Sequence, residues 1–332
     1  MRRAFVLIVL AVAPLFVFCS AYDAGDESEE APPRGDDAAS DSLASGPNDG
    51  GSIEEGTAPA VRCTSSQFTR SQHVASISSP RGEIGLWLSD DETEAYFGST
   101  FDHVSKQDAT TLSRMYRAKR ASRGQSFGEI VEVPLGLINR DVGTATLTQD
   151  RLTIIFTSAP FANFNFDIFR ATRASPSAPF EQAGALATLN DPNALDLTPF
   201  VSDKGDELFF VSSRNGAPFR IYHARAQQGG FAQPAELDVV PGRSLFNPVL
   251  SHDGRTLYFA GTVVADFSDR KVYRAHRPSV TETFGPALDV PELTGTGISP
   301  VWLSRDECRL YVAEERPTGL GSLDYYVYER DP

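Results

Sequence analysis

The chain is 332 residues long and acidic, with 44 Asp and Glu residues against 30 Lys and Arg residues and a net charge of −14. This balance offers no basic surface to nucleic acid or to an anionic membrane, which excludes those two classes of partner. The length would allow two ordinary domains, but a repeat that fills most of the chain indicates one β-rich domain.

The first 21 residues have the layout of an export signal. Two arginines precede an apolar run from Ala4 to Phe18, which is too short for a transmembrane helix. One interpretation places cleavage after Ala21. In the other, Cys19 is acylated as in a bacterial lipoprotein, because a long polar tether follows it, although Phe18 is bulky where that signal prefers a small residue. Both predict export to the periplasm, and the second adds a lipid anchor in the outer membrane.

Residues 22–60 are predicted to form a disordered acidic tether, and residues 61–332 a single folded domain. The tether has scarcely any large apolar residue, so it cannot bury enough surface to offset the entropy lost on folding. It carries eleven acidic residues and one basic residue, Arg34. Repulsion among the like charges extends it.

The folded domain contains an aromatic position that recurs at intervals of 53, 53, 51 and 53 residues. The five copies are Tyr116, Phe169, Tyr222, Tyr273 and Tyr326. A period near fifty, built from short β-type segments, is typical of a β-propeller, in which each blade buries its faces against its neighbours.

Each repeat predicts four strands. A short apolar segment, such as NPVL from Asn247, reads as the inner strand, and a turn such as Asp253-Gly254 leads into a second strand. The third strand carries the recurring aromatic residue and alternates apolar with polar positions. A phenylalanine with an apolar residue six positions later marks the fourth strand, as in Phe284 and Val290.

The fifth repeat lacks this last signal, because its phenylalanine would fall near position 337, beyond Pro332. An unmatched copy, Phe68 with Val74, precedes the first repeat. We therefore predict a five-bladed propeller of four-stranded blades in which an N-terminal strand completes the last blade. A six-bladed ring is the alternative.

Two cysteines of the domain fall in that same predicted blade. Cys63 precedes the N-terminal strand, and Cys308 lies in the turn of the last repeat. An exported protein can form a disulfide, which predicts a bridge between them. The alternative is two separate buried thiols.

The motifs SHDGRTLYF from Ser251 and DIFRATR from Asp167 resemble the WD40-like repeat of TolB-type bacterial propellers. The resemblance runs from Phe68 to Arg330 and implies the propeller fold, whereas this repeat serves many unrelated functions. TolB has six blades and a separate N-terminal α/β domain that engages its partner. This chain shows five motifs and a tether, so that partner role is not carried over.

A glycosidase site at the channel would require two carboxylates about 5 to 10 Å apart, one on each side of the bond that is cleaved. Glu83 and Asp196 occupy the same repeat position in the first and third blades, and Asp141 lies nearby in the second. The alternative is that all three are solvated loop carboxylates, since no hydrolase motif surrounds them.

No cofactor or metal is expected, because the five histidines lack the spacing of a zinc site and no glycine-rich phosphate loop is present. Trp87 and Trp302 occupy matching inner-strand positions, where they could stack on a sugar or pack between blades. The sequence favours a monomeric, non-catalytic binding or scaffolding propeller of the cell envelope that contacts a protein or a glycan. The alternative is a carbohydrate-active enzyme or lectin with its site at the channel mouth.

Overall fold

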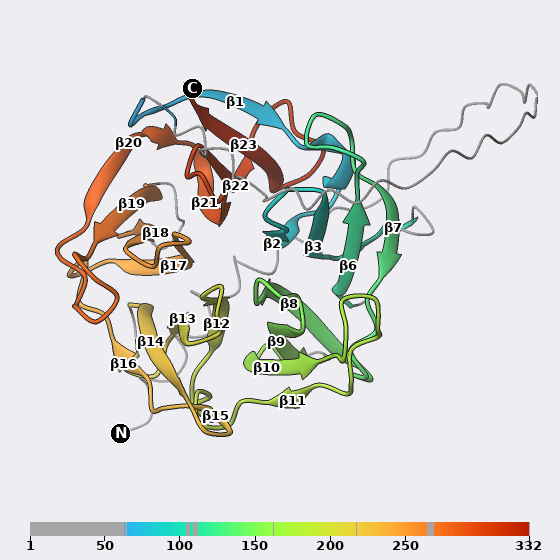
Figure 1. Ribbon diagram of the computed structural model, residues 1–332, viewed down its shortest axis with the longest axis horizontal. Helices are drawn as coiled ribbons and strands as arrows, with labels where there is room; N and C mark the ends of the chain where they lie inside the picture. The colour runs from blue at the N-terminus through green and yellow to red at the C-terminus, as the bar shows by residue number, and fades with distance from the viewer. Residues whose placement is uncertain are drawn as a thin grey trace, which may run out of the picture.

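The computed structural model describes residues 63, 65–103, 107–108, 112–161, 163–216, 218–263 and 269–331. In this part of the chain, five antiparallel sheets stand around a central axis as the blades of a propeller (Figure 1). The prediction of five blades is confirmed, and the six-bladed alternative is wrong. The predicted export signal, Cys19 and the tether lie outside the described residues. Within the described ranges, no helix is long and apolar enough to cross a membrane.

In the first four blades the strands follow one another in chain order, with the first strand nearest the axis. In the first blade they are β2 (Glu83–Leu88), β3 (Glu94–Ser99), β6 (Arg114–Lys119) and β7 (Gly128–Glu132). In the second they are β8 (Arg140–Leu147), β9 (Thr153–Pro160), β10 (Asp167–Thr172) and β11 (Gly184–Ala185). In the third they are β12 (Asp196–Val201), β13 (Glu207–Ser212), β14 (Arg220–Gln227) and β16 (Ala235–Glu236), with β15 (Gly230–Phe231) also paired to β14.

The fourth and fifth blades differ in the origin of their outer strand. The fourth consists of β17 (Ser244–Leu250), β18 (Thr256–Thr262), β19 (Lys271–His276) and β20 (Leu288–Thr294). The fifth consists of β21 (Thr296–Leu303), β22 (Arg309–Glu315), β23 (Asp324–Arg330) and β1 (Phe68–His73). Outside the blades lie a small hairpin, β4 (Phe101–Asp102) with β5 (Gln107–Asp108), and one short 3₁₀ helix, η2 (Ala75–Ile77).

The second strand of a blade is apolar on both faces, because both faces are covered by neighbouring blades. Every residue of β3 and of β13 is buried. The third strands β6 and β19 instead alternate buried and exposed positions, as expected near the rim of the ring. The core is therefore a set of layers between blades rather than one central cluster.

The ring closes where β1, from the start of the folded domain, pairs antiparallel with β23, from its end (Figure 1). The register sets Phe68 opposite Arg330 and His73 opposite Tyr326. This pairing confirms the predicted closure. It gives the last blade its fourth strand and covers the edge of β23, which would otherwise expose unpaired backbone groups.

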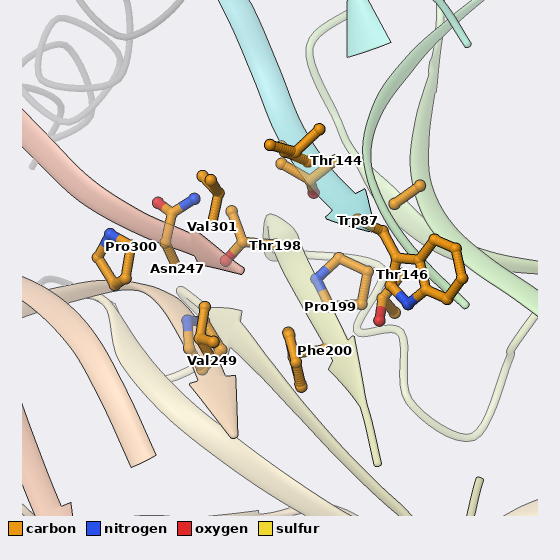
Figure 2. A pocket seen from close by; sticks show the side chains of 14 residues that line it. Trp87, Thr144, Thr146, Thr198, Pro199, Phe200, Asn247, Val249, Pro300 and Val301 are labelled. Atoms are coloured by element: carbon orange, nitrogen blue, oxygen red, sulfur yellow. The ribbon is translucent and has the colours of Figure 1, made fainter. Parts of the chain in front are cut away.

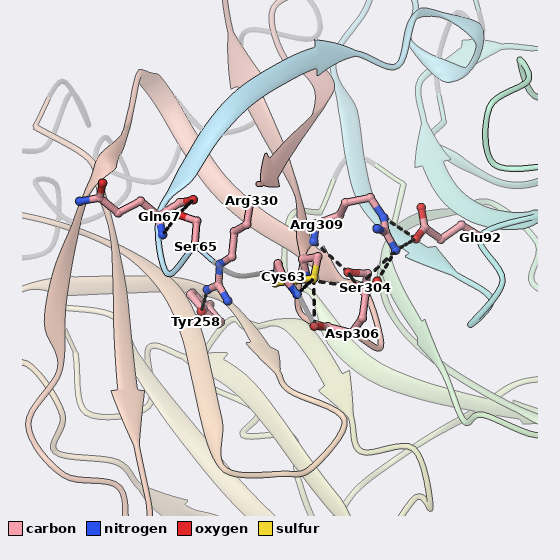
Figure 3. Close-up of a disulfide and its surroundings, with 10 residues drawn as sticks. Cys63, Ser65, Gln67, Glu92, Tyr258, Ser304, Asp306, Arg309 and Arg330 are labelled. Atoms are coloured by element: carbon pink, nitrogen blue, oxygen red, sulfur yellow. Dashed lines mark hydrogen bonds and ion pairs between the residues drawn. A yellow bond between two sulfur atoms is a disulfide. The ribbon is translucent and has the colours of Figure 1, made fainter. Parts of the chain in front are cut away.

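A disulfide between Cys63 and Cys308 fastens the beginning of β1 to the turn between β21 and β22 (Figure 3). The two Cα atoms are 5.6 Å apart, and 245 residues separate the cysteines in the sequence. The chain-entropy model assigns a loop of this length an upper value of about 5 kcal/mol. The predicted bridge is thus present at the blade that needs it for closure.

One hydroxyl organises the turn between the first and second strand of a blade. The Ser251 Oγ atom donates to Asp253 at 2.6 Å and accepts the backbone N–H of Thr256 at 2.8 Å. Gly254 takes the left-handed conformation that completes the turn, with φ at 72°. The equivalent hydroxyls belong to Ser89, Thr148, Ser202 and Ser304. The hydroxyl residue that recurs in all five turns therefore serves the turn, as does the Asp253-Gly254 pair that the sequence predicts.

Arginines that follow the third strands link the blades. In four of the five blades the guanidinium carbon lies 4.2 to 4.6 Å from the centre of the phenylalanine ring near the fourth strand. The pairs are Arg120 with Phe127, Arg173 with Phe180, Arg277 with Phe284, and Arg330 with Phe68. The third blade has Ala226 at this position. The fourth pair unites residues from opposite ends of the domain.

Each of these arginines also reaches into the preceding blade. The buried Arg277 guanidinium forms two hydrogen bonds with Glu207 of β13, at 3.1 and 2.5 Å. Burial opposes ionisation of Glu207, but hydrogen bonds from His223 and Arg277 outweigh it and lower the pKa of that carboxyl to about 2.

The seam between the fifth and first blades has a corresponding ion pair. Glu92, buried in the turn of the first blade, accepts a hydrogen bond from Arg309 at 2.7 Å (Figure 3). It also accepts one from the Tyr311 hydroxyl at 2.7 Å. The Tyr325 hydroxyl donates to the carbonyl oxygen of Gly85 at 2.6 Å. Side chains of β22 and β23 in the fifth blade thus form hydrogen bonds with the first blade.

Replacing Cys63 and Cys308 with serine is expected to lower the free energy of unfolding by at most about 5 kcal/mol, because the unfolded chain regains its loop entropy. Urea unfolding of the oxidised proteins measures the change. A reductant should shift the wild type to the midpoint of the double variant and leave the variant unmoved. Equal midpoints for the two oxidised proteins would contradict the prediction.

The variant Arg277→Met is expected to have a free energy of unfolding about 3 kcal/mol lower than the wild type. The reason is that the Glu207 carboxylate loses the arginine of a buried ion pair. Arg114→Met is the matched control, since Arg114 and Glu132 form a pair in which both side chains are nearly half exposed. Its cost should stay below about 1 kcal/mol. Urea midpoints compare the two, and similar losses would argue against the role given to Arg277.

Candidate functional site

The innermost strands surround a channel along the axis of the ring. β2, β8, β12, β17 and β21 all contribute to its wall (Figure 2). The space measures about 310 Å³ when the open solvent at its mouth is included. Because this figure counts open solvent, the enclosed space is smaller, and only a small group can enter.

The wall is mostly apolar, with a few uncharged polar groups. None of the lining residues carries a charge; they are Gly85, Leu86, Trp87, Thr144, Ala145, Thr146, Thr198, Pro199, Phe200, Asn247, Pro248, Val249, Pro300 and Val301. The prolines fit because each inner strand is the edge of its sheet, where a missing N–H removes no ladder bond.

Every inner strand bulges where it meets the channel. In β12, Thr198 and Pro199 together face Phe210, and in β17, Asn247 and Pro248 together face Phe259. The bulge turns residues into the left-handed region, with φ of 46° at Thr198 and 50° at Asn247. Such bulges redirect side chains toward the axis.

The three carboxylates predicted at the channel mouth lie at the starts of β2, β8 and β12, outside the lining of the cavity. Asp141 accepts hydrogen bonds from the backbone and hydroxyl of Ser113, at 2.8 and 3.1 Å. Asp196 accepts from Arg214 at 2.7 Å and from the backbone of Asp191 at 2.8 Å. In the described part of the chain, no hydrogen bond or ion pair joins any two of the three predicted carboxylates.

Glu83, the third of them, is only 2% exposed and accepts a hydrogen bond from Ser79. Burial raises the pKa of Glu83 well above its usual range, and the nearby charge of Asp324 adds to the shift. The Glu83 carboxyl therefore holds a proton more firmly than an ordinary glutamate. With so little exposed surface, it has no direct access to a sugar in the channel.

The two tryptophans differ in exposure to the channel. Trp87 lines the cavity and packs edge-on against Tyr96, with ring centres 5.8 Å apart. Trp302 makes the same contact with Tyr311 but does not line the cavity. Only Trp87 could meet a ligand there.

For the described residues, the structure shows no group of three or more His, Cys, Asp or Glu side chains that could hold a metal ion.

A ring of polar residues, which the sequence analysis missed, surrounds the axis where the inner strands end. It contains the residue after the turn hydroxyl in each blade: Asp90, Gln149, Asp203, His252 and Arg305. Asp90 accepts hydrogen bonds from Gln149 at 2.7 Å and from Arg305 at 2.5 Å. His252 contacts Asp203 at 2.8 Å and the carbonyl oxygen of Leu303 at 3.3 Å. The backbone N–H of Gln149 donates to the carbonyl oxygen of Asp203, so the polar ring joins all five blades.

The two ends of the propeller differ in surface character. We call the end that bears the Ser-x-Asp turns and the disulfide the turn face, and the opposite end the loop face. Among the described residues, eight large apolar side chains are exposed, and five of them are in connections at the loop face: Ile138, Phe161, Phe164, Val263 and Leu320. Val280 is at the turn face, and Val131 and Leu288 are on outer strands.

Two of these connections, the one that carries Ile138 and the one that carries Phe161, lie next to each other. The backbone N–H of Phe161 donates to the carbonyl oxygen of Asn139 at 2.9 Å, which places Phe161 beside the loop that carries Ile138. Ile138 is 84% exposed, and Phe161 and Phe164 are 50% and 55% exposed. We call these three residues the apolar knuckle. Exposed clusters of this kind on a soluble surface commonly mark interaction sites.

The polar ring should make stability depend on pH through His252. Burial opposes protonation of His252, but the hydrogen bond and charge of Asp203 outweigh it and raise the pKa above the ordinary value of 6.5. The added stability is therefore present below about pH 6.5 and is lost as pH rises through the pKa of the folded protein. Glu83 acts in the same direction, because its pKa in the folded protein is also raised.

His252→Gln should consequently reduce the loss of stability between about pH 6 and about pH 9 relative to the wild type. Urea unfolding at the two pH values measures this difference in stability. Glu83 is present in both the wild type and the variant, so its contribution cancels in the comparison. The control is His276→Gln, which alters an exposed histidine of β19. A wild-type pH dependence in the His252 variant would contradict the assignment.

Comparison with known proteins finds distant structural similarity. No protein-family model matches the sequence, and no curated protein matches it. Among solved structures, TolB from Acinetobacter baumannii superposes with a TM-score of 0.48 and 15% identity, over 77% of this chain and 57% of that one. The chain thus spans little more than half of that TolB.

Two further propeller structures are similar to the same degree. A luciferin-regenerating enzyme has a TM-score of 0.44 and 10% identity, over 78% of this chain and 95% of that one. A nidogen/laminin complex has a TM-score of 0.45 and 12% identity, over 71% of this chain and 73% of that one. One of these structures is an enzyme and the other is a complex of two proteins.

Proposed function

We propose that the protein is an exported, non-catalytic binding or scaffolding propeller whose loop face contacts a protein or glycan of the bacterial cell envelope. The observation that carries this proposal is the concentration of exposed apolar side chains at the loop face. They are held on short connections between rigid strands, an arrangement suited to recognition.

The disulfide supplies an orientation for this function. Cys63 is bound at the turn face through Cys308, so the chain enters the propeller at the end opposite the apolar knuckle. With the acidic tether and lipidation at Cys19 that we propose upstream, an anchored protein would direct its loop face away from the membrane. A monomer suffices for this arrangement.

A role as a carbohydrate-active enzyme is the less favoured alternative. Glu83 is buried, and Asp141 and Asp196 are each engaged by partners of their own. A lectin retains one supporting feature, because Trp87 lines the channel and offers an aromatic surface to a sugar.

Site-specific photocrosslinking in the native envelope tests the proposal. A photoreactive amino acid at Phe161 should give discrete adducts with a protein or glycan, because the apolar knuckle lies in the interface. The matched position is Val280, an exposed apolar residue at the turn face. Adducts at Val280 with none at Phe161 would contradict the proposal, as would a single adduct pattern from both positions.

A further inference from the structure

Two polar side chains of the channel wall have no hydrogen-bond partner among the described residues. The Thr198 hydroxyl is buried and makes no hydrogen bond. The Asn247 side-chain amide, which also lines the cavity, makes none of the hydrogen bonds found in the described part of the structure. They come from β12 and β17, the inner strands of consecutive blades, and both line the channel wall (Figure 2). An unsatisfied buried group such as the Thr198 hydroxyl is rare enough to require an explanation. The Asn247 side chain is partly exposed and offers its amide to the channel.

The backbone holds both residues in a conformation that glycine would adopt more easily. Thr198 and Asn247 have φ values of 46° and 50°, and the equivalent residue of the first blade is Gly85 at 63°. A β-branched residue such as Thr198 rarely occupies this region. Glycine could form the bulge equally well, so the bulge does not explain why these positions carry a threonine and an asparagine side chain. Strained, unpartnered residues of this kind gather at ligand sites.

We propose that the channel binds a small uncharged molecule bearing an amide group, which Thr198 and Asn247 hydrogen-bond from two sides. Asparagine offers a carbonyl acceptor and an N–H donor, and the threonine hydroxyl can donate or accept, so together they match an amide. None of the lining residues is charged, so none of them would offset the cost of removing an ionised ligand from water. An uncharged ligand is therefore favoured. The apolar body of the ligand packs against Trp87 and the wall prolines.

The two tryptophans provide a direct measurement of this binding. The full chain with its disulfide formed, labelled with nitrogen-15, gives one indole N–H signal for Trp87 and one for Trp302. Acetamide is the probe, and acetate, of nearly the same shape but ionised, is its control. The Trp87 signal should shift with acetamide in a saturable way, with a dissociation constant of ~10 mM for so few atoms. The Trp302 signal, from a residue outside the lining, should remain in place.

Two variants assign the hydrogen bonds. Thr198→Val keeps the branched shape and removes the hydroxyl, and Asn247→Gly removes the amide while suiting the left-handed backbone. Each should weaken acetamide binding about fivefold, as expected for one lost hydrogen bond. The matched control is Asn139→Gly, which makes the same change at an exposed residue with φ of 54° and should leave binding unchanged.

Several results would overturn the proposal: a Trp87 shift that does not saturate, an equal response to acetate, or wild-type affinity in both channel variants. Signal dispersion in the nitrogen-15 spectrum verifies that each variant is folded. The site is separate from the apolar knuckle, so failure here leaves the crosslinking result at Phe161 unaffected.

Discussion

The pairing of β1 with β23 is the interaction on which the rest of the structure depends. Without β1, the last blade would have three strands, and β23 would expose an unpaired edge. The blades bury their faces only against one another, so an open ring would also expose the layer between the fifth and first blades. The Glu92 ion pair and the Tyr325 hydrogen bond at that seam form only when the ring is closed. The disulfide keeps the two chain ends together while these contacts hold.

The repeat made most of the fold predictable. Its period, its turn motif and the displaced copy at Phe68 are local patterns, and together they favoured five blades closed by an N-terminal strand over a six-bladed ring. The position of Cys308 in the last turn then followed from the same alignment of repeats. Each of these inferences used only the rule that equivalent residues occupy equivalent places.

Contacts between blades could not be read in the same way. Arg277 and Glu207 are 70 residues apart, and nothing in the sequence near either one indicates the other. A signal was present, since an arginine follows the recurring aromatic residue by four positions in four of the five repeats. Likewise, Thr198 and Asn247 precede prolines in aligned inner strands, but only the bulges show that they take left-handed conformations and face the channel.

The candidate carboxylates show the limit of alignment by repeat. Equivalent repeat positions place Glu83 and Asp196 at the same height along the propeller axis. That height does not determine the direction in which each side chain points. Local partners decide that: Arg214 engages Asp196, and the packing of the seam buries Glu83. The channel that remains is narrow and uncharged, whereas the loop face carries most of the exposed apolar surface. This division is the basis on which we propose recognition in place of hydrolysis.

Hydrogen–deuterium exchange of the intact, oxidised chain tests the closure most directly. In β1, residues 68–73, the backbone amides directed at β23 should be protected about as well as those of β7, residues 128–132, the outer strand of the first blade. The β7 strand is continuous with its own blade, so it sets the protection expected of an outer strand. Exchange of the β1 amides at the rate of an unfolded peptide, with β7 protected, would contradict a ring closed by its N-terminal strand.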